Sequence, residues 1–553
     1  MGYIHAGRIT AQSLKNEGVS HLFTLCGGHI QSIYDGCIDL DIRVVDFRHE
    51  QAAAHAAEGW ARATGEVGVA AVTAGPGVTD AVTAVANAQR SGCPMVLIGG
   101  QGPRALSEMG SLQEMDHVSL MRSITKWSTT VPESRRIPDY LATAFRKAKT
   151  GVPGPVFLEM PLDVLMDYVD ESTVSYPEKY CTTAGTAGDP AYVTRAVELL
   201  ASAQRPVAIV GSQLWWSSHK DAFGAWRDAF SVPCFVNGMA RGSLQPGDPL
   251  GFRLCRSKAL VEADVVVVFG TPLDFRIGYG RPPKVSADAL FVQVDLDPQE
   301  LGRNRSCEVG VVGDTGLVMD AMTRGLSDSA LSLGDRSDWL EHLRSLEAEM
   351  EQKILAEAGS AASPVNPLRL CSELAAVLDE KSVIVGDGGD IVGTGAKILS
   401  VGGMGQWMDP GPLGTLGVGP SFAMAAKLAD PDRDVVILYG DGSFGLNGME
   451  FEACARQKIG IVGVIGNDAA WMQILRGQKA IYGAERMVAT QLNYTRYEKM
   501  VEALGGRGYW VDDPNELAEV LAEATRVARE EQVPTLVNVQ IGSSDFRKDA
   551  ISV

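Results

Sequence analysis

Short apolar runs, glycine turns and helical stretches follow one another along almost the whole chain. In the first part, apolar runs at 67–73, 94–100 and 154–161 predict strands, and 51–63 and 78–90 predict helices. A repeat of strand, glycine turn and helix is typical of parallel sheets that helices cover on both faces. The pattern therefore predicts an α/β protein.

The repeat divides into three units of similar size rather than one giant sheet. A segment rich in Thr, Gly and Pro at 171–190 predicts a linker, and 325–365 predicts a second one that contains a helix at 337–357. Further strands are expected at 206–211, 264–270, 290–295, 382–386, 434–440, 459–466 and 535–541. We expect three consecutive parallel-sheet α/β domains at 1–170, 190–325 and 365–545, and a C-terminal tail at 546–553.

The composition is that of an ordinary globular protein, with 45% apolar and 21% charged residues, and 553 residues are too many for one core. The nine cysteines form no Cys-x-x-Cys pair, which argues against a disulfide framework and against structural zinc. A net charge of −19 disfavours nucleic acid and anionic membranes as partners. We find no bilayer-spanning apolar run and no secretion signal, so we expect a cytoplasmic protein without a membrane partner.

Two aspartates lie where apolar strands end. Asp441 follows the strand at 434–439, in Gly-Asp-Gly-Ser, and Asp468 follows the strand at 459–465, in Gly-Asn-Asp-Ala-Ala-Trp. Neighbouring parallel strands would bring both carboxylates to one sheet edge, where open α/β folds bind ligands. Two carboxylates and a turn carbonyl suit Mg²⁺, which is usually held together with phosphate oxygens. The alternative is a pair of ordinary turns, each with a surface aspartate.

Three residues of the first unit are candidates for acid–base chemistry. Glu50 lies between the strand at 42–47 and an Ala-rich helix, where a carboxylate is commonly only a first-turn anion. His29 lies in a Gly-Gly turn; it is neutral near physiological pH and suited to exchange a proton with a hydroxyl, although a lone histidine is more often structural. Gln113 alone would be unremarkable.

These motifs together resemble the thiamine-diphosphate-dependent enzymes of the acetolactate synthase and oxalyl-CoA decarboxylase group. Gly-Pro-Gly at 75–77 and Gly-Thr-Leu-Gly-Val-Gly at 414–419 match the group's other signatures. The chain departs from the usual pattern at Asp468 and Asp80, where asparagine is more common. The resemblance implies thiamine diphosphate and Mg²⁺ as cofactors, with Asp441, Asp468 and the Ala470 carbonyl as metal ligands. The cofactor-binding residues that it implies are Gly75, Pro76, Gly388, Gly389, Asp390, Gly414, Leu416, Gly440, Asp441, Gly442, Ser443, Asp468, Ala470, Trp471 and Met472.

The resemblance also implies a role for each catalytic candidate. Glu50 would bond to N1′ of the cofactor's aminopyrimidine and favour its imino tautomer, which requires shielding from water. The Gly414 carbonyl would accept from the 4′-amino group. The Leu416 side chain would separate the two rings, although it is also an ordinary core leucine. His29 and Gln113 occupy places where benzaldehyde lyase orients a hydroxyl.

Within this group the chain most resembles the 2-hydroxyacyl-CoA lyases, also described as acetolactate synthase-like. The likeness includes 238–242, 274–276, 385–390, Trp407, 409–411, 413–419, 466–469, 545–547 and 551–553. It implies cleavage of a 2-hydroxyacyl-CoA to formyl-CoA and an aldehyde or ketone, or the reverse condensation. One rival is a carboligase that acts on 2-oxo acids or free aldehydes. Another is a non-catalytic or Rossmann-type nucleotide-binding protein, although no Gly-x-Gly-x-x-Gly opens a helix.

Coenzyme A would bring three phosphates to an acidic protein and needs a local basic patch. Arginine suits phosphate contacts, and the candidates are Arg253, Arg256, Lys258, Arg276, Arg281, Lys284 and, in a tail that could close over the thioester arm, Arg547. The alternatives are a solvated face and a frayed end. The central domain is a candidate site for CoA or ADP. The resemblance also implies a homodimer or homotetramer with the active site between subunits.

Overall fold

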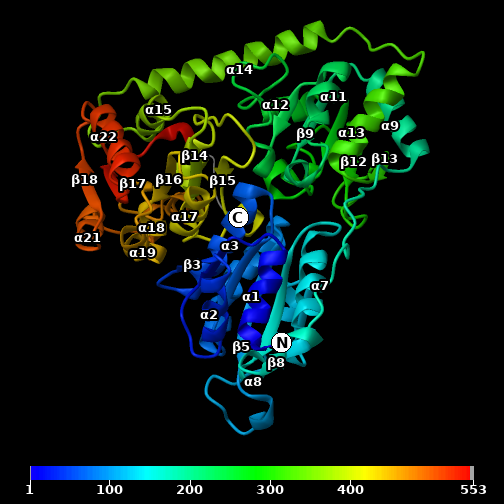
Figure 1. Cartoon of the computed structure of the whole chain (residues 1–553). Helices are drawn as coiled ribbons and strands as arrows, with labels where there is room; N and C mark the ends of the chain where they lie inside the picture. The colour runs from blue at the N-terminus through cyan, green and yellow to red at the C-terminus, as the bar shows by residue number, and fades with distance from the viewer. Residues whose placement is uncertain (1, 548–553) are drawn as a thin grey trace.

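Residues 2–547 are described by the computed structural model of this chain (Figure 1). Within that range, three sheets of parallel strands lie between helices, which confirms the predicted α/β class. Their strand orders are β3-β2-β4-β5-β7-β6, β10-β9-β11-β12-β13 and β15-β14-β16-β17-β19-β18. The first block lies at the bottom of Figure 1, the central block at the upper right and the third block at the upper left.

The first block contains both long predicted helices, but the stretch at 78–90 is divided at Ala81 into α4 and α5. A short antiparallel pair, β1 (Tyr3–His5) and β8 (Tyr168–Asp170), closes the block. Its sheet strands are β2 (His21–Thr24), β3 (Arg43–Asp46), β4 (Gly68–Val72), β5 (Met95–Gln101), β6 (Trp127–Thr130) and β7 (Pro155–Pro161). Its helices are α1 (Ala6–Asn16), α2 (Gln31–Asp39), α3 (Glu50–Thr64), α4 (Pro76–Asp80), α5 (Val82–Ser91), α6 (His117–Met121), α7 (Ile137–Lys149) and α8 (Leu162–Leu165).

The central block has a five-stranded sheet around a buried strand of four valines and a phenylalanine, β11. Helices on both faces of this sheet explain why β11 is apolar throughout. Its strands are β9 (Pro206–Val210), β10 (Cys234–Val236), β11 (Val265–Phe269), β12 (Leu290–Asp295) and β13 (Val309–Val312). Its helices are α9 (Pro190–Ser202), α10 (Gln213–Trp216), α11 (Ala222–Phe230), α12 (Arg256–Glu262) and α13 (Thr315–Ser327).

The third block repeats the parallel arrangement near the C-terminus, and its central strand β16 pairs with β14 and β17. Its strands are β14 (Val383–Asp387), β15 (Trp407–Met408), β16 (Val435–Gly440), β17 (Val462–Asn467), β18 (Arg507–Val511) and β19 (Thr535–Gln540). Its helices are α15 (Pro367–Val377), α16 (Asp390–Gly395), α17 (Gly419–Ala429), α18 (Asp441–Asn447), α19 (Glu450–Gln457), α20 (Met472–Tyr482), α21 (Tyr497–Ala503) and α22 (Leu517–Glu530).

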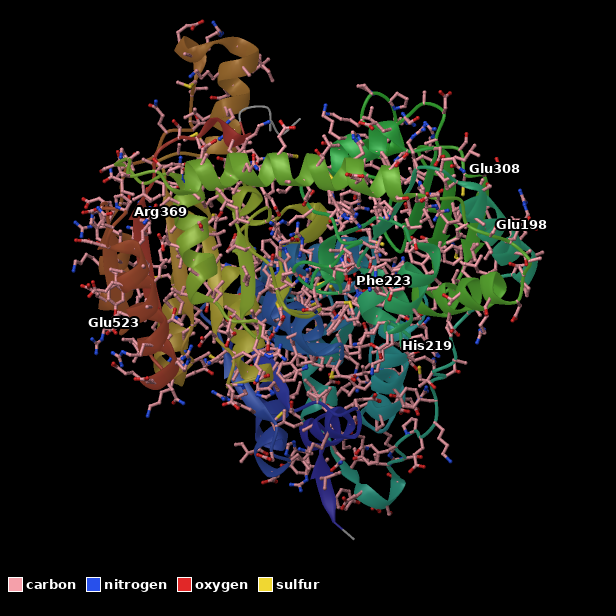
Figure 2. The ribbon with its side chains drawn as sticks, turned by 90° about the horizontal axis from the view of Figure 1, so that it is seen from above. Glu198, His219, Phe223, Glu308, Arg369 and Glu523 are labelled. Atoms are coloured by element: carbon pink, nitrogen blue, oxygen red, sulfur yellow. The ribbon has the colours of Figure 1, made fainter. Side chains whose placement is uncertain are left out.

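A long helix, α14 (Ser337–Ala358), crosses the molecule between the central and third blocks. Figure 2 shows it running from the side that carries Phe223 and Glu308 toward the side that carries Arg369. At its start, Trp339 is buried and its Nε1 donates to the Pro206 carbonyl of the central block. Near its end, Ile354 packs against Leu368 of the third block. The predicted linker at 325–365 therefore consists mostly of this helix, close to the expected 337–357, and the helix packs against both blocks.

One arginine contacts all three blocks. Arg62 on α3 bonds through Nη2 to Glu58 Oε1 at 2.6 Å within the first block. Its Nη1 lies 2.9 Å from the Asp409 carbonyl of the third block and 3.8 Å from Met239 Sδ of the central block. Its guanidinium also covers the Phe422 ring of α17 at 5.0 Å. Because Arg62 and Glu58 are 3% and 0% exposed, they form a buried pair at the junction of the blocks.

Candidate active site

The two predicted aspartates lie side by side at the carboxyl edge of the third sheet. β16 and β17 are parallel and pair Gly440 with Gly466, so Asp441 and Asp468 leave adjacent strands. The Ala470 amide donates to Asp441 Oδ2 at 3.2 Å, which joins the two turns. Burial raises the pKa of Asp441 to about 6. Burial and then the charges of Asp441 and Asp390 raise the pKa of Asp468 to about 8.

The backbone around these aspartates is unusual and tightly closed. Ala469, between Asp468 and Ala470, has a left-handed φ of 56°, which is uncommon for a residue with a side chain and is often found at functional sites. A Cβ at Gly388 would lie 2.7 Å from the Gly440 nitrogen, and one at Gly442 would lie 2.6 Å from the Trp471 ring. These glycines therefore let the ends of β14 and β16 and the turn after β17 approach closely.

The donor set suits a divalent cation bound together with an anion. The charge of Asp441 raises the proton affinity of Asp468, and a cation between the two carboxylates would relieve that repulsion. Among the described hydrogen bonds, none uses the Ala470 carbonyl, so that oxygen can act as a third ligand. Helix α18 begins at Asp441, and the backbone amides of its first turn are suited to phosphate.

A buried acid holds the loop with the Gly-Thr-Leu-Gly-Val-Gly sequence. Asp387, at the end of β14, is fully buried and accepts from the Gly417 amide at 3.0 Å and the Gly419 amide at 2.7 Å. Burial raises its pKa to about 6. The sequence analysis assigns no role to Asp387, although an acid directly after the strand predicted at 382–386 can indicate a site. On the same loop, Gly414 is exposed and Leu416 is half-buried.

The predicted Asp390 lies near the aspartate edge and is held by two arginines. It begins α16 and makes two bonds of 2.7 Å to the guanidinium of Arg476 on α20. Arg547, near the end of the described chain, adds a contact of 3.1 Å from Nε to Asp390 Oδ1. Asp390 therefore ties α20 and the start of the C-terminal tail to the aspartate edge. Of the predicted tail at 546–553, only Phe546 and Arg547 fall within the described residues.

In the first block, the structure joins His29 and Gln113 through a threonine. The Thr73 hydroxyl lies 3.0 Å from His29 Nδ1 and 3.2 Å from Gln113 Oε1. Gln113 has a left-handed backbone φ of 60°, which is uncommon for a residue with a side chain and is often found at functional sites. Burial lowers the pKa of His29; the Leu112 carbonyl opposes this shift and His117 adds to it. His29 is therefore neutral at physiological pH.

The neighbouring glycine loop is anchored by residues that the sequence did not reveal. The Gly75 amide donates to His117 Nε2 at 2.8 Å, and Nδ1 of the same ring lies 2.8 Å from Glu159 Oε2. A ring with its proton on Nδ1 satisfies both contacts. Gly75 has a φ of 58° and no room for a Cβ, which would lie 2.8 Å from Gln113 Cβ, so only glycine fits there.

Glu50 is the first residue of α3 and is 9% exposed. Its carboxylate accepts no hydrogen bond from the side chains and backbone that the structure describes. Ligand atoms of His49, Glu50 and Asp80 lie within 4.8 Å of one another. A nearly buried carboxylate without a partner is costly, so Glu50 fits a role in which a ligand or another subunit supplies its partner.

A second buried glutamate, Glu450, joins the third block to the first and makes stability depend on pH. It is 1% exposed and accepts from the Arg48 amide through both carboxylate oxygens, at 3.1 and 3.0 Å. Burial raises its pKa from 4.5 to about 7. Between these values the native protein holds a proton that the unfolded chain has released, so the free energy of unfolding falls as pH rises.

We expect Glu450→Gln to reduce this loss of stability by on the order of 2–3 kcal/mol, because glutamine does not titrate and still accepts a hydrogen bond. Urea unfolding of both proteins at about pH 5 and about pH 8 measures the difference. Glu452→Gln, which removes a more exposed carboxylate of the same helix, is the control. Identical pH slopes for wild type and Glu450→Gln would contradict the expectation.

A cavity of about 570 Å³ lies between the central and third blocks and gathers positive charge. Its basic lining residues are Arg241, Arg253, Arg256, Lys397 and Arg547. Its two lining carboxylates are Glu347 and Glu351, and Glu347 already accepts from the Arg253, Leu254 and Cys255 amides. In a chain of net charge −19, the basic lining of this cavity has a charge that suits an anion.

The basic side chains of this cavity repel one another, because the nearby carboxylates do not fully neutralise their charge. Burial, then the charges of Arg241 and Arg276, lower the pKa of Arg256 to about 10. Burial, then Arg256 and Arg547, lower the pKa of Lys397. A bound polyanion would relieve both effects. Of the seven cations predicted for CoA, Arg253, Arg256 and Arg547 line this cavity, whereas Arg241 and Lys397 were not anticipated.

A second cavity, of about 510 Å³, lies between the first and central blocks at the carboxyl ends of β9, β11 and β12. Its lining includes Ser212, Gly270, Asp295 and the predicted Arg276. Arg276 is paired with Asp274 at 2.7 Å. The remaining predicted cations, Lys258, Arg281 and Lys284, line neither of the two cavities.

The helices of the described residues include none with the length and apolar character to cross a membrane.

Models of the thiamine pyrophosphate enzymes match all three blocks. The N-terminal TPP binding domain matches residues 4–120, the central domain 193–322 and the C-terminal TPP binding domain 387–539. Each match falls on one of the three sheets, and the first and last cover the two halves of the site described above.

Similar proteins extend over nearly the whole chain. 2-Hydroxyacyl-CoA lyase 2 of Homo sapiens is 39% identical, over 99% of this chain and 92% of that protein. The probable acetolactate synthase of Mycobacterium bovis is 38% identical, over 97% and 95%. 2-Hydroxyacyl-CoA lyase 2 of Caenorhabditis elegans is 37% identical, over 99% and 91%. As its motifs predict, this chain belongs to the thiamine pyrophosphate enzyme family.

Proposed function

We propose that this protein is a 2-hydroxyacyl-CoA lyase that uses thiamine diphosphate and Mg²⁺. It would cleave the C1–C2 bond of a 2-hydroxyacyl-CoA to formyl-CoA and an aldehyde or ketone, or run the reverse condensation. Similarity to 2-hydroxyacyl-CoA lyase 2 from several animals supports this function. The single observation that carries the choice of a CoA substrate is the cationic cavity beside Asp390, because an enzyme for free aldehydes needs no such charge.

In this proposal the third block, 365–545, holds the cofactor diphosphate and the first, 1–170, holds its pyrimidine. Asp441, Asp468 and the Ala470 carbonyl are the Mg²⁺ ligands, a set that fits the cation's preference for oxygen. When bound, thiamine diphosphate supplies the electron sink that makes cleavage next to a carbonyl possible. Glu50 accepts from the pyrimidine, and its exclusion from water keeps that hydrogen bond strong.

The residues of the first block act on the substrate hydroxyl in this proposal. His29 is neutral and accepts the proton of the 2-hydroxyl group as the C1–C2 bond breaks. Gln113 donates to the same oxygen and holds it in place. The proton lost at the hydroxyl is balanced by the proton gained at C1 of formyl-CoA. The other product leaves as an aldehyde or ketone, according to the substitution at C2.

Incubation with 2-hydroxyacyl-CoA esters of several chain lengths, followed by mass detection of formyl-CoA, tests this function. We expect formyl-CoA and the matching aldehyde only when thiamine diphosphate and Mg²⁺ are present. Pyruvate and benzoin are the comparison substrates for the two carboligase alternatives. Acetolactate or benzaldehyde as the main product, with no formyl-CoA from any ester, would contradict the proposal.

The cationic cavity makes a separate prediction about substrate affinity. We expect Arg256→Gln to raise KM for the CoA ester roughly tenfold or more, because charge-assisted contacts to phosphate contribute about 1.5–3 kcal/mol each. Its effect on a CoA-free acyloin substrate should be small. Arg281→Gln, which lies outside the cavity, is the matched control. Equal effects of Arg256→Gln on the two kinds of substrate would exclude the cavity as the CoA site.

We also propose that the active unit is at least a homodimer, as a dimer or a tetramer. Helix α20 has no buried residue. Three of its apolar side chains, Ile474, Ile481 and Tyr482, are 47%, 51% and 61% exposed. Leu112, next to Gln113, is 78% exposed. A second subunit would cover these apolar groups, and its third block would bring the cofactor whose pyrimidine Glu50 binds. The 510 Å³ cavity at the carboxyl ends of the central strands is the site we assign to an adenine nucleotide such as ADP.

A further inference from the structure

A hydroxyl lies between the two side chains that the proposed function assigns to the substrate. Thr73 follows β4, and its Oγ1 lies 3.0 Å from His29 Nδ1 and 3.2 Å from Gln113 Oε1. The three residues come from different loops of the first block. Thr73 and His29 are each 7% exposed, so water competes little for these bonds.

The hydrogen bond that the Thr73 hydroxyl donates to the Gln113 amide oxygen sets the direction of this chain of bonds. The amide oxygen of Gln113 can only accept, so it receives the single proton of the Thr73 hydroxyl. The hydroxyl oxygen then accepts a hydrogen bond from His29 Nδ1–H. A neutral imidazole with its proton on Nδ1 carries its lone pair on Nε2. At the other end, Gln113 keeps its NH₂ group available as a donor.

We propose that Thr73 is a positioning residue that sets the tautomer of His29 and the orientation of the Gln113 amide together. His29 then presents an acceptor, Nε2, to the substrate hydroxyl proton, and Gln113 presents a donor to the hydroxyl oxygen. One hydroxyl therefore couples both groups, and reversing one end of the chain reverses the other. This inference rests on the proposed function and assigns a role that no sequence motif indicated.

The surrounding backbone holds the three side chains in one arrangement. A Cβ at Gly27 would lie 2.3 Å from Thr73 Cβ, and a Cβ at Gly100 would lie 2.5 Å from His29 Cβ. Contacts this short leave no room for a side chain, so the main chain itself encloses Thr73 and His29. On the other side, the left-handed backbone of Gln113, with a φ of 60°, directs its amide to the threonine.

Two further polar groups act on His29, the His117 ring and the Leu112 carbonyl. His117 lowers the proton affinity of His29, but its own ring is held between Glu159 and the Gly75 amide. The Leu112 carbonyl favours the charged form of His29. If the Thr73 hydroxyl were removed, this carbonyl would be the remaining protein partner of the His29 ring. The tautomer population should therefore change in a variant without the hydroxyl.

The test compares Thr73→Val, which removes the hydroxyl with little change of shape, with Thr73→Ser, which retains it. We expect valine to lower kcat about tenfold or more, with KM nearly unchanged, since full loss of an acid–base group costs about 10²–10⁴-fold. Serine should restore most of kcat. The control is Thr10→Val, a fully buried threonine of α1 whose hydroxyl donates to the Ala6 carbonyl. Equal kcat for Thr73→Val and wild type would overturn the proposal.

A second measurement does not depend on turnover. Solid-state NMR of the ¹⁵N-histidine-labelled holoenzyme without substrate reports which ring nitrogen carries the proton. The His29 signals are identified by their loss in His29→Gln. We expect Nδ1–H in wild type and in Thr73→Ser, and a changed tautomer in Thr73→Val. Unchanged His29 signals in Thr73→Val would overturn the proposal, and they would do so even if formyl-CoA production, and with it the proposed function, failed.

Discussion

Replacement of Glu50 by glutamine is expected to lower kcat by roughly 10²–10⁴-fold, the range that a positioned acid–base group contributes. Glutamine keeps the size of the side chain but cannot share a proton with the cofactor's pyrimidine. The low exposure of Glu50, 9%, and the absence of a described partner for its carboxylate are what a ligand-directed role requires. Steady-state rates at saturating thiamine diphosphate and Mg²⁺ measure the effect.

The competing explanation for Glu50 is a favourable charge at the start of α3. Such a charge contributes only about 0.3–1 kcal/mol to stability and nothing to turnover. Glu519→Gln, in the first turn of α22, is the matched control for that effect. A Glu50→Gln variant with normal kcat and a small loss of stability would assign Glu50 to the helix terminus alone.

Asp441→Ala is expected to abolish the stabilisation that the cofactors give to the folded protein. A ligand present at about 100 times its dissociation constant stabilises by about 2.7 kcal/mol. Asp441 is 2% exposed and bonded to the Ala470 amide, so alanine removes a ligand and also loosens the turn that carries Asp468. Thermal unfolding with and without thiamine diphosphate and Mg²⁺ should show a shift in wild type and none in Asp441→Ala.

Asp468→Asn is the informative control for this experiment. An amide oxygen remains a ligand for Mg²⁺, whereas asparagine removes the charge of Asp468, whose pKa is raised to about 8 by burial and then by Asp441 and Asp390. We expect this variant to retain a cofactor-dependent shift and to lose less than tenfold in activity, well below the effect of Asp441→Ala. A normal shift in Asp441→Ala would refute its assignment as a metal ligand.

The sequence predicted the interior strands better than the edges of the sheets. The apolar runs predicted at 264–270 and 434–440 correspond to β11 and β16, which have neighbours on both sides. The strands that received no prediction include β6, β13 and β18, which lie at the ends of their sheets. β6 (Trp-Ser-Thr-Thr) and β18 (Arg-Gly-Tyr-Trp-Val) carry polar residues and lack a continuous apolar run, as partly covered edge strands often do, whereas β13 (Val-Gly-Val-Val) is apolar but only four residues long.

The candidate site was predictable where its chemistry lies within one motif. Asp441 and Asp468 follow apolar strands, and the sequence alone brought them together. Thr73 and Asp387 escaped because their partners, such as Gln113 and Gly419, lie about 30–40 positions away, beyond any local pattern. The prediction of one basic cluster was only partly correct, for the opposite reason. Closeness in sequence suggested one patch, but tertiary folding draws the cations of the 570 Å³ cavity from distant segments.

The contacts of Arg62 have a consequence for recombination between relatives of this enzyme. Cutting the chain in the predicted linkers would transplant the central block as a seemingly independent cassette. A foreign cassette would nevertheless have to place a compatible group at position 239, against a guanidinium already fixed by Glu58 and the Asp409 carbonyl. Chimaeras should therefore depend on the neighbour that they offer to this side chain as well as on their crossover points.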